Sequence, residues 1–390
     1  MLKSRGRTSV VIALGTTQTI AWGSTYYLPA ILARPTAAEF GVPASAIFAM
    51  FSAALVLAGV AGPFVGRSID RHGGRWMLAV SNLVLALGLA MMGWAPNLPW
   101  LCIAWLVMGA GMSMGLYEAA FSALTAAYGH EARAPITGIT LIAGFASTVA
   151  WPLTGLLDAE IGWRGACFVW AAIHLGICAP LNLWAIPSAV PHPPRGRSSD
   201  PAVPTGGNTR AMVLLSFVFA TTMSISTSMA AHLPVLLQVA GASPAAAIAA
   251  AALVGPAQVA ARVFEFSLMR RMHPMFSARI ATLAHPIGAG VLLTAGVPVA
   301  ALFTVVHGAG NGVLTIAKGT VPLALFGPAG YGLRQGLLSG PARFAQAGAP
   351  LVFGVAMEEL GTHALLLTAL LGLSAYAAMV ALGRTRPVQR

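Results

Sequence analysis

Long apolar stretches recur along the whole chain, with short polar segments between them. Val10–Leu32, Trp76–Trp94, Leu98–Ala127 and His363–Leu382 are typical examples. A helix of about twenty apolar residues crosses the ~30 Å hydrocarbon core of a bilayer, whereas the strands of a membrane barrel need only about ten alternating residues. The run length therefore predicts twelve membrane-spanning helices, near residues 8–33, 44–66, 76–95, 98–127, 135–157, 163–186, 210–239, 244–269, 276–296, 299–326, 334–357 and 362–383.

One long polar stretch, residues 187–209, divides this pattern into six spans and six spans. It is rich in proline, glycine and serine, and such a composition cannot bury enough apolar surface to order itself. We therefore expect a flexible cytoplasmic linker between an N-terminal six-helix bundle, residues 1–186, and a C-terminal six-helix bundle, residues 210–390.

Short matches relate the two halves to each other at offsets of 198 to 205 residues, in corresponding spans and in the same order. They pair Leu28-Pro29 with Leu233-Pro234, Gly109-Ala110-Gly111 with Gly308-Ala309-Gly310, and Pro152-Leu153 with Pro350-Leu351. With an even number of spans in each half, such repeats are related by an axis along the membrane normal. The predicted fold is an all-α membrane protein of two pseudo-symmetric six-helix bundles.

Composition and charge agree with a membrane location. The chain is 57% hydrophobic and 8% charged, whereas a soluble domain carries about 25% charged residues. The net charge of +12 invites a nucleic-acid-binding interpretation, but the predicted topology places 17 of the 22 basic residues on one side, with only Arg34 and Arg164 outside. This bias follows the positive-inside rule. We expect both termini in the cytoplasm, an inner-membrane location and no nucleic-acid partner.

Motifs for enzymatic or metal chemistry do not stand out. Cys102, Cys167 and Cys178 all fall inside predicted spans, where a free cysteine behaves as a small hydrophobe. The sequence has no phosphate-binding Walker loop, no HExxH motif and no Cys-x-x-Cys pair. We therefore expect no enzyme, no ATP-driven pump, and neither a cofactor nor a metal.

The loop after the second predicted span carries a glycine- and arginine-rich motif, Gly66-Arg67-Ser68-Ile69-Asp70-Arg71-His72-Gly73-Gly74-Arg75. It resembles the G-x-x-x-D-R-x-G-R-R signature of the major facilitator superfamily, with Gly74 in place of one arginine. The resemblance implies a twelve-helix transporter in which the motif's aspartate latches one conformation. It assigns that latch to Gly66, Asp70, Arg71, Gly73 and Arg75, with Arg133 as a candidate partner of Asp70. The alternative is ordinary positive-inside charge.

Other signatures of the superfamily are weak or absent. The second-half counterpart of the loop, residues 267–274, keeps only its charge. Drug-exporting members usually carry an arginine in the fourth span, where this chain has Trp105 nearby, and their glycine–proline motif survives only around Pro152. These departures weaken an assignment as a multidrug antiporter.

Five ionisable residues lie inside predicted spans, where such groups are costly and are functional candidates. They are Glu118, Arg262, Glu265, Lys318 and Arg343. Three cations against two carboxylates favour an anionic substrate, and a planar guanidinium suits a carboxylate. Arg262 resembles the span-8 arginine that binds the substrate carboxylate in monocarboxylate and oxalate porters of the superfamily, and Arg343 is similar to the cation that oxalate porters carry in span 11. The alternatives are a structural Arg262–Glu265 pair at i and i+3 and snorkelling of Lys318 and Arg343 to the headgroups.

A buried carboxyl has a raised pKa and can exchange protons, so Glu118 and Glu265 are the candidates for proton coupling. The alternative for Glu118 is a permanent ion pair. Gln18, Tyr26 and Asn311 add neutral hydrogen-bonding groups to the predicted substrate site. His232 and His307 are candidate proton relays, with packing histidines as the simpler interpretation.

We therefore predict a proton-coupled carrier that moves a small organic anion by alternating access, acting as a monomer in the bilayer. The main alternative is a proton-antiport exporter of drugs or metabolites that uses the same carboxylates. A membrane-embedded enzyme or receptor would need a catalytic constellation or an added soluble domain.

Overall fold

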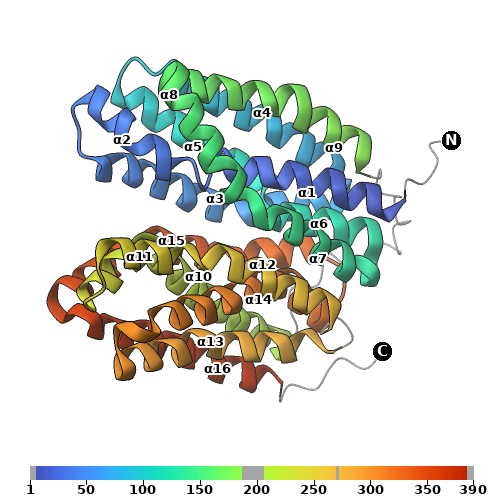
Figure 1. Cartoon of the computed structure of the whole chain (residues 1–390). Helices are drawn as coiled ribbons and strands as arrows, with labels where there is room; N and C mark the ends of the chain where they lie inside the picture. Colours follow the sequence, from blue (N-terminus) through green and yellow to red (C-terminus); the bar gives the residue numbers. More distant parts are fainter. Residues whose placement is uncertain (1–5, 187–205, 269–271, 384–390) are drawn as a thin grey trace. The chain divides into compact units, whose positions relative to one another are not determined.

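The computed structural model describes residues 6–186, 206–268 and 272–383, without the side chains of 206–208 (Figure 1). Within those ranges all the regular structure is helical, as the apolar run lengths predict. Parts of two predicted features lie outside the described residues, namely 187–205 of the linker and 269–271 of the second-half loop.

The helices up to residue 186 are α1 Arg7–Gly23, α2 Pro29–Phe40, α3 Ala44–His72, α4 Gly74–Gly93, α5 Leu98–Gly115, α6 Tyr117–Tyr128, α7 Arg133–Ile142, α8 Ala146–Ile173 and α9 Ala179–Ala185. Those from residue 206 are α10 Gly206–Val239, α11 Pro244–Ala252, α12 Val254–Ser267, α13 Pro274–Ala295, α14 Ala300–Phe326, α15 Tyr331–Leu360 and α16 Ala364–Leu382.

Local sequence explains where several helices are interrupted. The predicted span 8–33 is two helices, because α1 ends at Gly23 and Pro29 opens α2; proline is well tolerated at the first position of a helix. Leu116 takes an extended conformation between α5 and α6. Gly162 has a φ of +73° inside α8, which only glycine adopts readily, and it marks the predicted boundary between two spans.

Eight continuous helical stretches of the described chain are long and apolar enough to cross a membrane. One of them, Leu98–Ala185, runs for 88 residues, which at ~1.5 Å per residue is several times the thickness of a bilayer. This stretch therefore contains more than one crossing. The chain is a multi-pass membrane protein, and the count of twelve spans stays a prediction.

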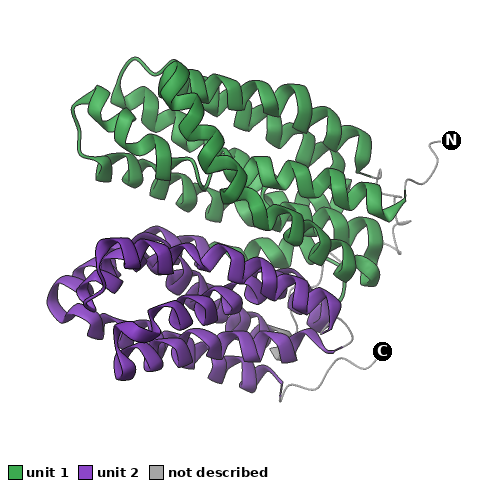
Figure 2. Cartoon of the chain, in the orientation of Figure 1, with its two compact units in different colours: residues 1–201, 327–340 green, residues 202–326, 341–390 purple. Residues whose placement is uncertain are grey.

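The chain forms two compact units, shown in different colours in Figure 2. Unit 1 comprises residues 1–201 and 327–340, and unit 2 comprises 202–326 and 341–390. The start of α15, predicted to belong to the second half, therefore groups with unit 1. Helix α10 begins at Gly206, so residues 206–209, which we predicted as the end of the linker, form its first turn. The division into two six-helix bundles remains a proposal.

The repeated Gly-Ala-Gly segment allows close helix packing at corresponding positions of each unit. In unit 1, a Cβ on Gly109 would lie 2.4 Å from the carbonyl oxygen of Ala54 on α3. In unit 2, a Cβ on Gly308 would lie 2.7 Å from the carbonyl oxygen of Val254 on α12. The last glycine of each segment faces the next helix, α4 or α13. Corresponding helices thus approach closely at corresponding positions, which gives the internal repeat a physical cause.

Candidate functional site

The three cations predicted inside spans lie in unit 2, with Arg262 on α12, Lys318 on α14 and Arg343 on α15. Arg262 on α12 is only 5% exposed and reaches α14, where its guanidinium donates to the carbonyl oxygen of Gly312 and to the hydroxyl of Thr315, each at 3.4 Å. A third hydrogen bond, also of 3.4 Å, runs to the side-chain oxygen of Gln258. The bonds to Gly312 and Thr315 hold Arg262 against α14.

Lys318 and Arg343 are connected through two neutral side chains of the same unit. The ammonium of Lys318 contacts the sulfur of Met223 on α10, and the amide of Gln346 donates to that sulfur at 3.3 Å. The Gln346 oxygen in turn accepts a hydrogen bond of 3.4 Å from Arg343. We call these four residues the cation chain. The sequence predicted the two cations but not the methionine and glutamine between them.

A small cavity lies between α10, α13 and α14. Its walls include Thr222, Ser226, Thr282, His285, His307 and Asn311. Asn311 was predicted as a substrate residue, and it does face a cavity. Thr222, which lines this cavity, directly precedes Met223 of the cation chain on α10.

The two predicted proton carriers lie in different units. Glu265 is buried on α12, one turn beyond Arg262. Glu118 lies in the first turn of α6 in unit 1, where it is half-buried and its charge acts on the phenol of Tyr331. The proton-coupling roles of both carboxyls stay predictions.

Gln18 and Tyr26, predicted as substrate residues, belong to unit 1. The amide of Gln18 is buried and donates to the carbonyl oxygen of Gly115 at 2.6 Å, so it ties α1 to the end of α5. Tyr26 lies in a cluster of aromatic rings, with its ring centroid 5.2 Å from that of Trp22 and 5.6 Å from that of Phe51. A substrate role for either residue stays a prediction.

Asp70, the aspartate of the motif, binds the first turn of α15. Its two carboxylate oxygens accept hydrogen bonds of 2.8 Å from the backbone N–H groups of Gly332 and Leu333. The N-terminus of a helix offers unpaired N–H groups and a positive end of the helix dipole, so a carboxylate is favoured there. The sequence led us to expect a basic side chain, with Arg133 as the candidate, and gave no sign of this backbone site.

Glycines bring α3 and the start of α15 close enough for these bonds. A Cβ on Gly66 would lie 1.9 Å from the carbonyl oxygen of Gly332, and a Cβ on Gly336 would lie 2.4 Å from that of Gly62. The two helices therefore face each other with glycines spaced four apart on each, an arrangement that permits close backbone approach. The first glycine of the motif has this packing role.

The other residues predicted to form the latch are Arg71, Gly73 and Arg75, which follow Asp70 closely in the chain, and Arg133. Arg71 lies exposed in the last turn of α3. Gly73, with a φ of +78°, makes the turn into α4, which Arg75 enters as its second residue. Arg133 is half-buried at the start of α7. Their part in a latch stays a prediction.

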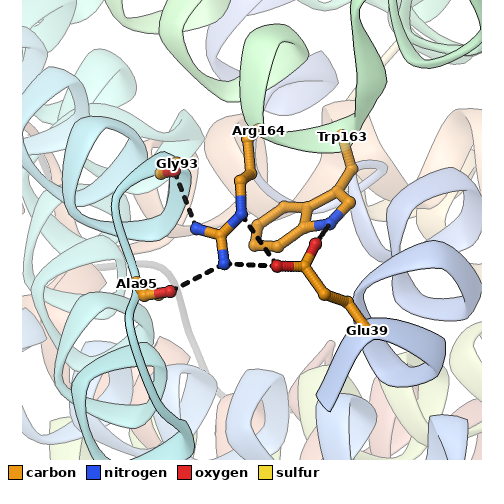
Figure 3. Close-up of polar contacts among 5 residues, drawn as sticks. All are labelled: Glu39, Gly93, Ala95, Trp163 and Arg164. Atoms are coloured by element: carbon orange, nitrogen blue, oxygen red, sulfur yellow. Dashed lines mark hydrogen bonds and ion pairs between the residues drawn. The ribbon is translucent and has the colours of Figure 1, made fainter. Parts of the chain in front are cut away.

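Arg164, predicted only as an external basic residue, joins three parts of unit 1 (Figure 3). Its guanidinium donates to the carbonyl oxygens of Gly93 and Ala95 at 2.9 and 2.8 Å, at the end of α4. It also binds the carboxylate of Glu39, at 2.6 Å, to which the indole of Trp163 donates as well. The hydrogen bond from Arg164 holds the pKa of Glu39 below its usual value. Gly162, whose φ is positive, directly precedes Trp163 and Arg164.

No group of three or more His, Cys, Asp or Glu side chains among the described residues could hold a metal ion. The residues that we take as the candidate site are the cation chain, Arg262 and the lining of the cavity, all in unit 2. Such an arrangement can bind a negatively charged group at one end and a neutral, hydrogen-bonding group at the other.

Comparisons with solved structures show the fold. A human organic anion transporter, MFSD10, superposes with a TM-score of 0.76 and 16% identity over 96% of this chain and 100% of the relative. The fucose:proton symporter FucP of E. coli gives a TM-score of 0.74 and 14% identity over 98% of this chain and all of the relative.

A shorter similarity links the chain to curated proteins. Monocarboxylate transporter 14 of Mus musculus is 32% identical over 120 residues, and that of Homo sapiens is 31% identical over the same length. These segments cover 30% of this chain and 23% of each relative, so the chain matches about a quarter of their length. A family model described as the Major Facilitator Superfamily matches residues 14–295. The chain belongs to the Major Facilitator Superfamily, a family of membrane transporters.

Proposed function

We propose that this transporter moves a small organic anion across the inner membrane, coupled to protons, with both termini in the cytoplasm and the protein acting as a monomer. The cation chain and Arg262 carry the proposal. Arg262 and Arg343 are almost fully buried, at 5% and 4% exposure, and Arg343 is joined to Lys318 through Gln346 and Met223. A planar guanidinium can donate two parallel hydrogen bonds to a carboxylate, which suits an organic anion as the solute.

The relatives support the class of substrate without naming it for this chain. One structural relative is an organic anion transporter, and the curated sequence relatives are monocarboxylate transporters. In our proposal Arg343 and Arg262 hold the anion, Lys318 adds charge, and Glu118 or Glu265 carries the proton.

We also propose that the Asp70 contact with α15 is the latch of the transport cycle. A carboxylate bound to two backbone N–H groups makes a strong but reversible contact, and rocking of the helices that carry it would break both bonds together. Arg71, Arg75 and Arg133 would then adjust the stability of the latched state through their charge.

A second candidate function rests on the aromatic cluster of unit 1. The ring of Trp22 packs against Tyr26 and Tyr117, and Phe51 connects Tyr26 to Trp105. Such a surface suits an aromatic solute, as an exporter of drugs or metabolites would carry. This candidate predicts binding of hydrophobic cations or neutral aromatics rather than carboxylates.

Uptake of radiolabelled carboxylates into proteoliposomes tests the proposal. We expect Arg343→Gln and Arg262→Gln each to reduce anion uptake at least tenfold, the order of one charge-assisted hydrogen bond, while the variants elute and melt like the wild type. Arg34→Gln is the matched control, because Arg34 is exposed in the middle of α2, in unit 1. Undiminished carboxylate uptake in both buried variants would exclude this binding role, and uptake of aromatic cations by the wild type would favour the exporter.

A further inference from the structure

Two buried histidines in unit 2 form a hydrogen-bonded pair at the wall of the cavity. The Nδ1 atoms of His285 on α13 and His307 on α14 are 3.0 Å apart. The other nitrogen of His285, Nε2, lies 2.9 Å from the hydroxyl oxygen of Thr368 on α16. Both rings are buried, at 6% and 4% exposure, and both line the cavity.

The direction of these hydrogen bonds follows from the single proton of the threonine hydroxyl. Thr368 lies 3.0 Å from the carbonyl oxygen of Leu365, to which it donates. Its oxygen therefore accepts from Nε2–H of His285, and the Nδ1 atom of His285 is left as an acceptor. The Nδ1–H of His307 must donate to it. The remaining nitrogen of His307, Nε2, then carries a lone pair, and none of the described residues donates a hydrogen bond to it.

Two other walls of the cavity also present acceptors. The hydroxyl of Thr222 donates to the carbonyl oxygen of Val218 in its own helix at 2.7 Å. The hydroxyl of Thr282 donates to the backbone carbonyl oxygen of Arg279 at 2.8 Å. Each hydroxyl keeps lone pairs on its oxygen. The cavity wall therefore offers acceptors from three helices, α10, α13 and α14, and a ligand that enters must supply donors.

The donors that fit are hydroxyl groups. An ammonium group would be repelled by Lys318 and Arg343 of the neighbouring cation chain, and none of the described residues that line the cavity is acidic. A hydroxyl is uncharged, donates one proton, and can accept in return from the side chains of Ser226 and Asn311, which also line the cavity.

The position of the cavity relative to the cation chain sets the length of the ligand. His307, Asn311 and Lys318 recur on one face of α14 at the three- and four-residue spacing of a helical stripe. At ~1.5 Å per residue, Lys318 lies about 10 Å along the axis from Asn311 and about 16 Å from His307. The lysine side chain itself bridges part of this distance.

We propose that this cavity is a hydroxyl-recognition subsite, in which Nε2 of His307 accepts a hydrogen bond from a hydroxyl group that the solute carries several atoms from its anionic end. His285 and Thr368 act as positioning residues that hold His307 in the acceptor tautomer. The proposal deepens the proposed function and rests on it for the anionic end: the substrate class is a hydroxylated organic anion.

Matched ligands test the subsite in the purified full-length protein by calorimetric titration. 6-Hydroxyhexanoate and hexanoate differ only in the terminal hydroxyl, and 1,6-hexanediol lacks the charge. We expect the wild type to bind 6-hydroxyhexanoate about tenfold more tightly than hexanoate, the order of one hydrogen bond to a buried acceptor. His307→Phe should bring the two acids within twofold of each other. His232→Phe is the matched control, because His232 bonds the carbonyl oxygen of Pro350 and does not line the cavity.

The outcomes separate this inference from the proposed function. Equal affinity for the two acids, or a preference that survives in His307→Phe, overturns the subsite while anion binding stands. Binding of hexanediol that depends on His307, without binding of either acid, supports the subsite and overturns the anionic substrate. If His307→Phe does not fold, ethoxyformylation of wild-type His307 serves instead: 6-hydroxyhexanoate should protect it at about tenfold lower concentration than hexanoate, and equal protection overturns the proposal.

Discussion

Arg164 illustrates how one side chain at the edge of the membrane region can hold several backbone segments. Its guanidinium donates to the carbonyl oxygens of Gly93 and Ala95, at and just beyond the end of α4, and binds Glu39 in the last turn of α2. A guanidinium can serve such a site because its five donors point in fixed directions. The Glu39 side chain is 45% exposed, so solvent screens this ion pair and its contribution to stability is modest.

The ion pair predicts a dependence of stability on pH. Since the pKa of Glu39 is lowered from its ordinary value of 4.5, the folded state favours the ionised carboxylate, and the pair stabilises the fold above that pH and ceases to do so as the pH falls through the lowered value. We expect Glu39→Gln to lower the free energy of unfolding at pH 7 by about 0.5–1 kcal/mol. Denaturant unfolding in detergent between about pH 3 and pH 7 should show the gap to the wild type closing towards the acid end.

Glu160→Gln is the control for this measurement, because Glu160 is an exposed carboxylate of the same unit. Its stability should match the wild type throughout. A gap for Glu39→Gln of the same size at both ends of the pH range would show that the carboxylate charge is not what stabilises the contact.

Helices α3 and α15 show how small residues and a single charge combine at the scale of elements. Glycines at 62 and 66 on α3 face those at 332 and 336 on α15, and only this close approach brings Asp70 to the N–H groups of α15. The motif is thus more than a set of charges in a loop. Its first glycine allows the backbones of α3 and α15 to approach closely, and its aspartate then accepts hydrogen bonds from the backbone of α15.

Gly66→Ala should therefore weaken the Asp70 contact as well as the packing. A Cβ there would meet a backbone carbonyl that cannot rotate away, and overpacking of this kind costs about 1–3 kcal/mol. We expect a lower melting temperature and faster amide hydrogen exchange at residues 331–334. Asp70→Asn should speed exchange at the same amides with a smaller change in melting temperature.

Gly155→Ala is the matched control, because a Cβ on Gly155, within α8, would meet no atom within 4 Å. Alanine is the better helix former, so that variant should be as stable as the wild type or slightly more so. Unchanged exchange at 331–334 in Gly66→Ala would show that the α3–α15 approach does not support the Asp70 bonds.

The ionisable residues of the proposed transport site are divided between the two units. Arg262, Lys318 and Arg343 lie in unit 2, whereas Glu118 lies in unit 1. In the proposed cycle, proton uptake in one unit is coupled to anion binding in the other. Coupling of this kind requires that each ligand favour one of two conformations. Replacing the proton-carrying carboxyl should therefore stop proton-driven uptake while leaving anion exchange intact.

Glu118→Gln should abolish uptake driven by a pH gradient and leave anion exchange at wild-type rates within about twofold. The glutamine keeps the shape and hydrogen bonding of a protonated glutamate but cannot release a proton. Proteoliposomes loaded with unlabelled or no anion separate the two modes. Glu359→Gln, an exposed carboxylate of α15, is the control. Gradient-driven uptake that persists in Glu118→Gln would pass the coupling role to Glu265 or to another group.

The sequence alone was enough to predict an all-helical, multi-pass membrane protein and to find the ionisable residues within its apolar segments. Run length and hydropathy determine which segments enter a bilayer, because burial in hydrocarbon depends on composition and not on partners. The repeat of Gly109-Ala110-Gly111 at Gly308 was visible for the same reason: close helix packing requires small residues in both units.

Only the tertiary structure decided which of these side chains meet. Lys318 and Arg343 are joined through Met223, 95 residues from Lys318 in the chain, and Asp70 finds backbone donors 262 residues away. His285 joins His307 on α14 to Thr368 on α16. Such contacts depend on the rotation and register of packed helices, which are set jointly by many side chains. A change of one residue in register turns a helix face by about 100°, so no local pattern in the sequence encodes them.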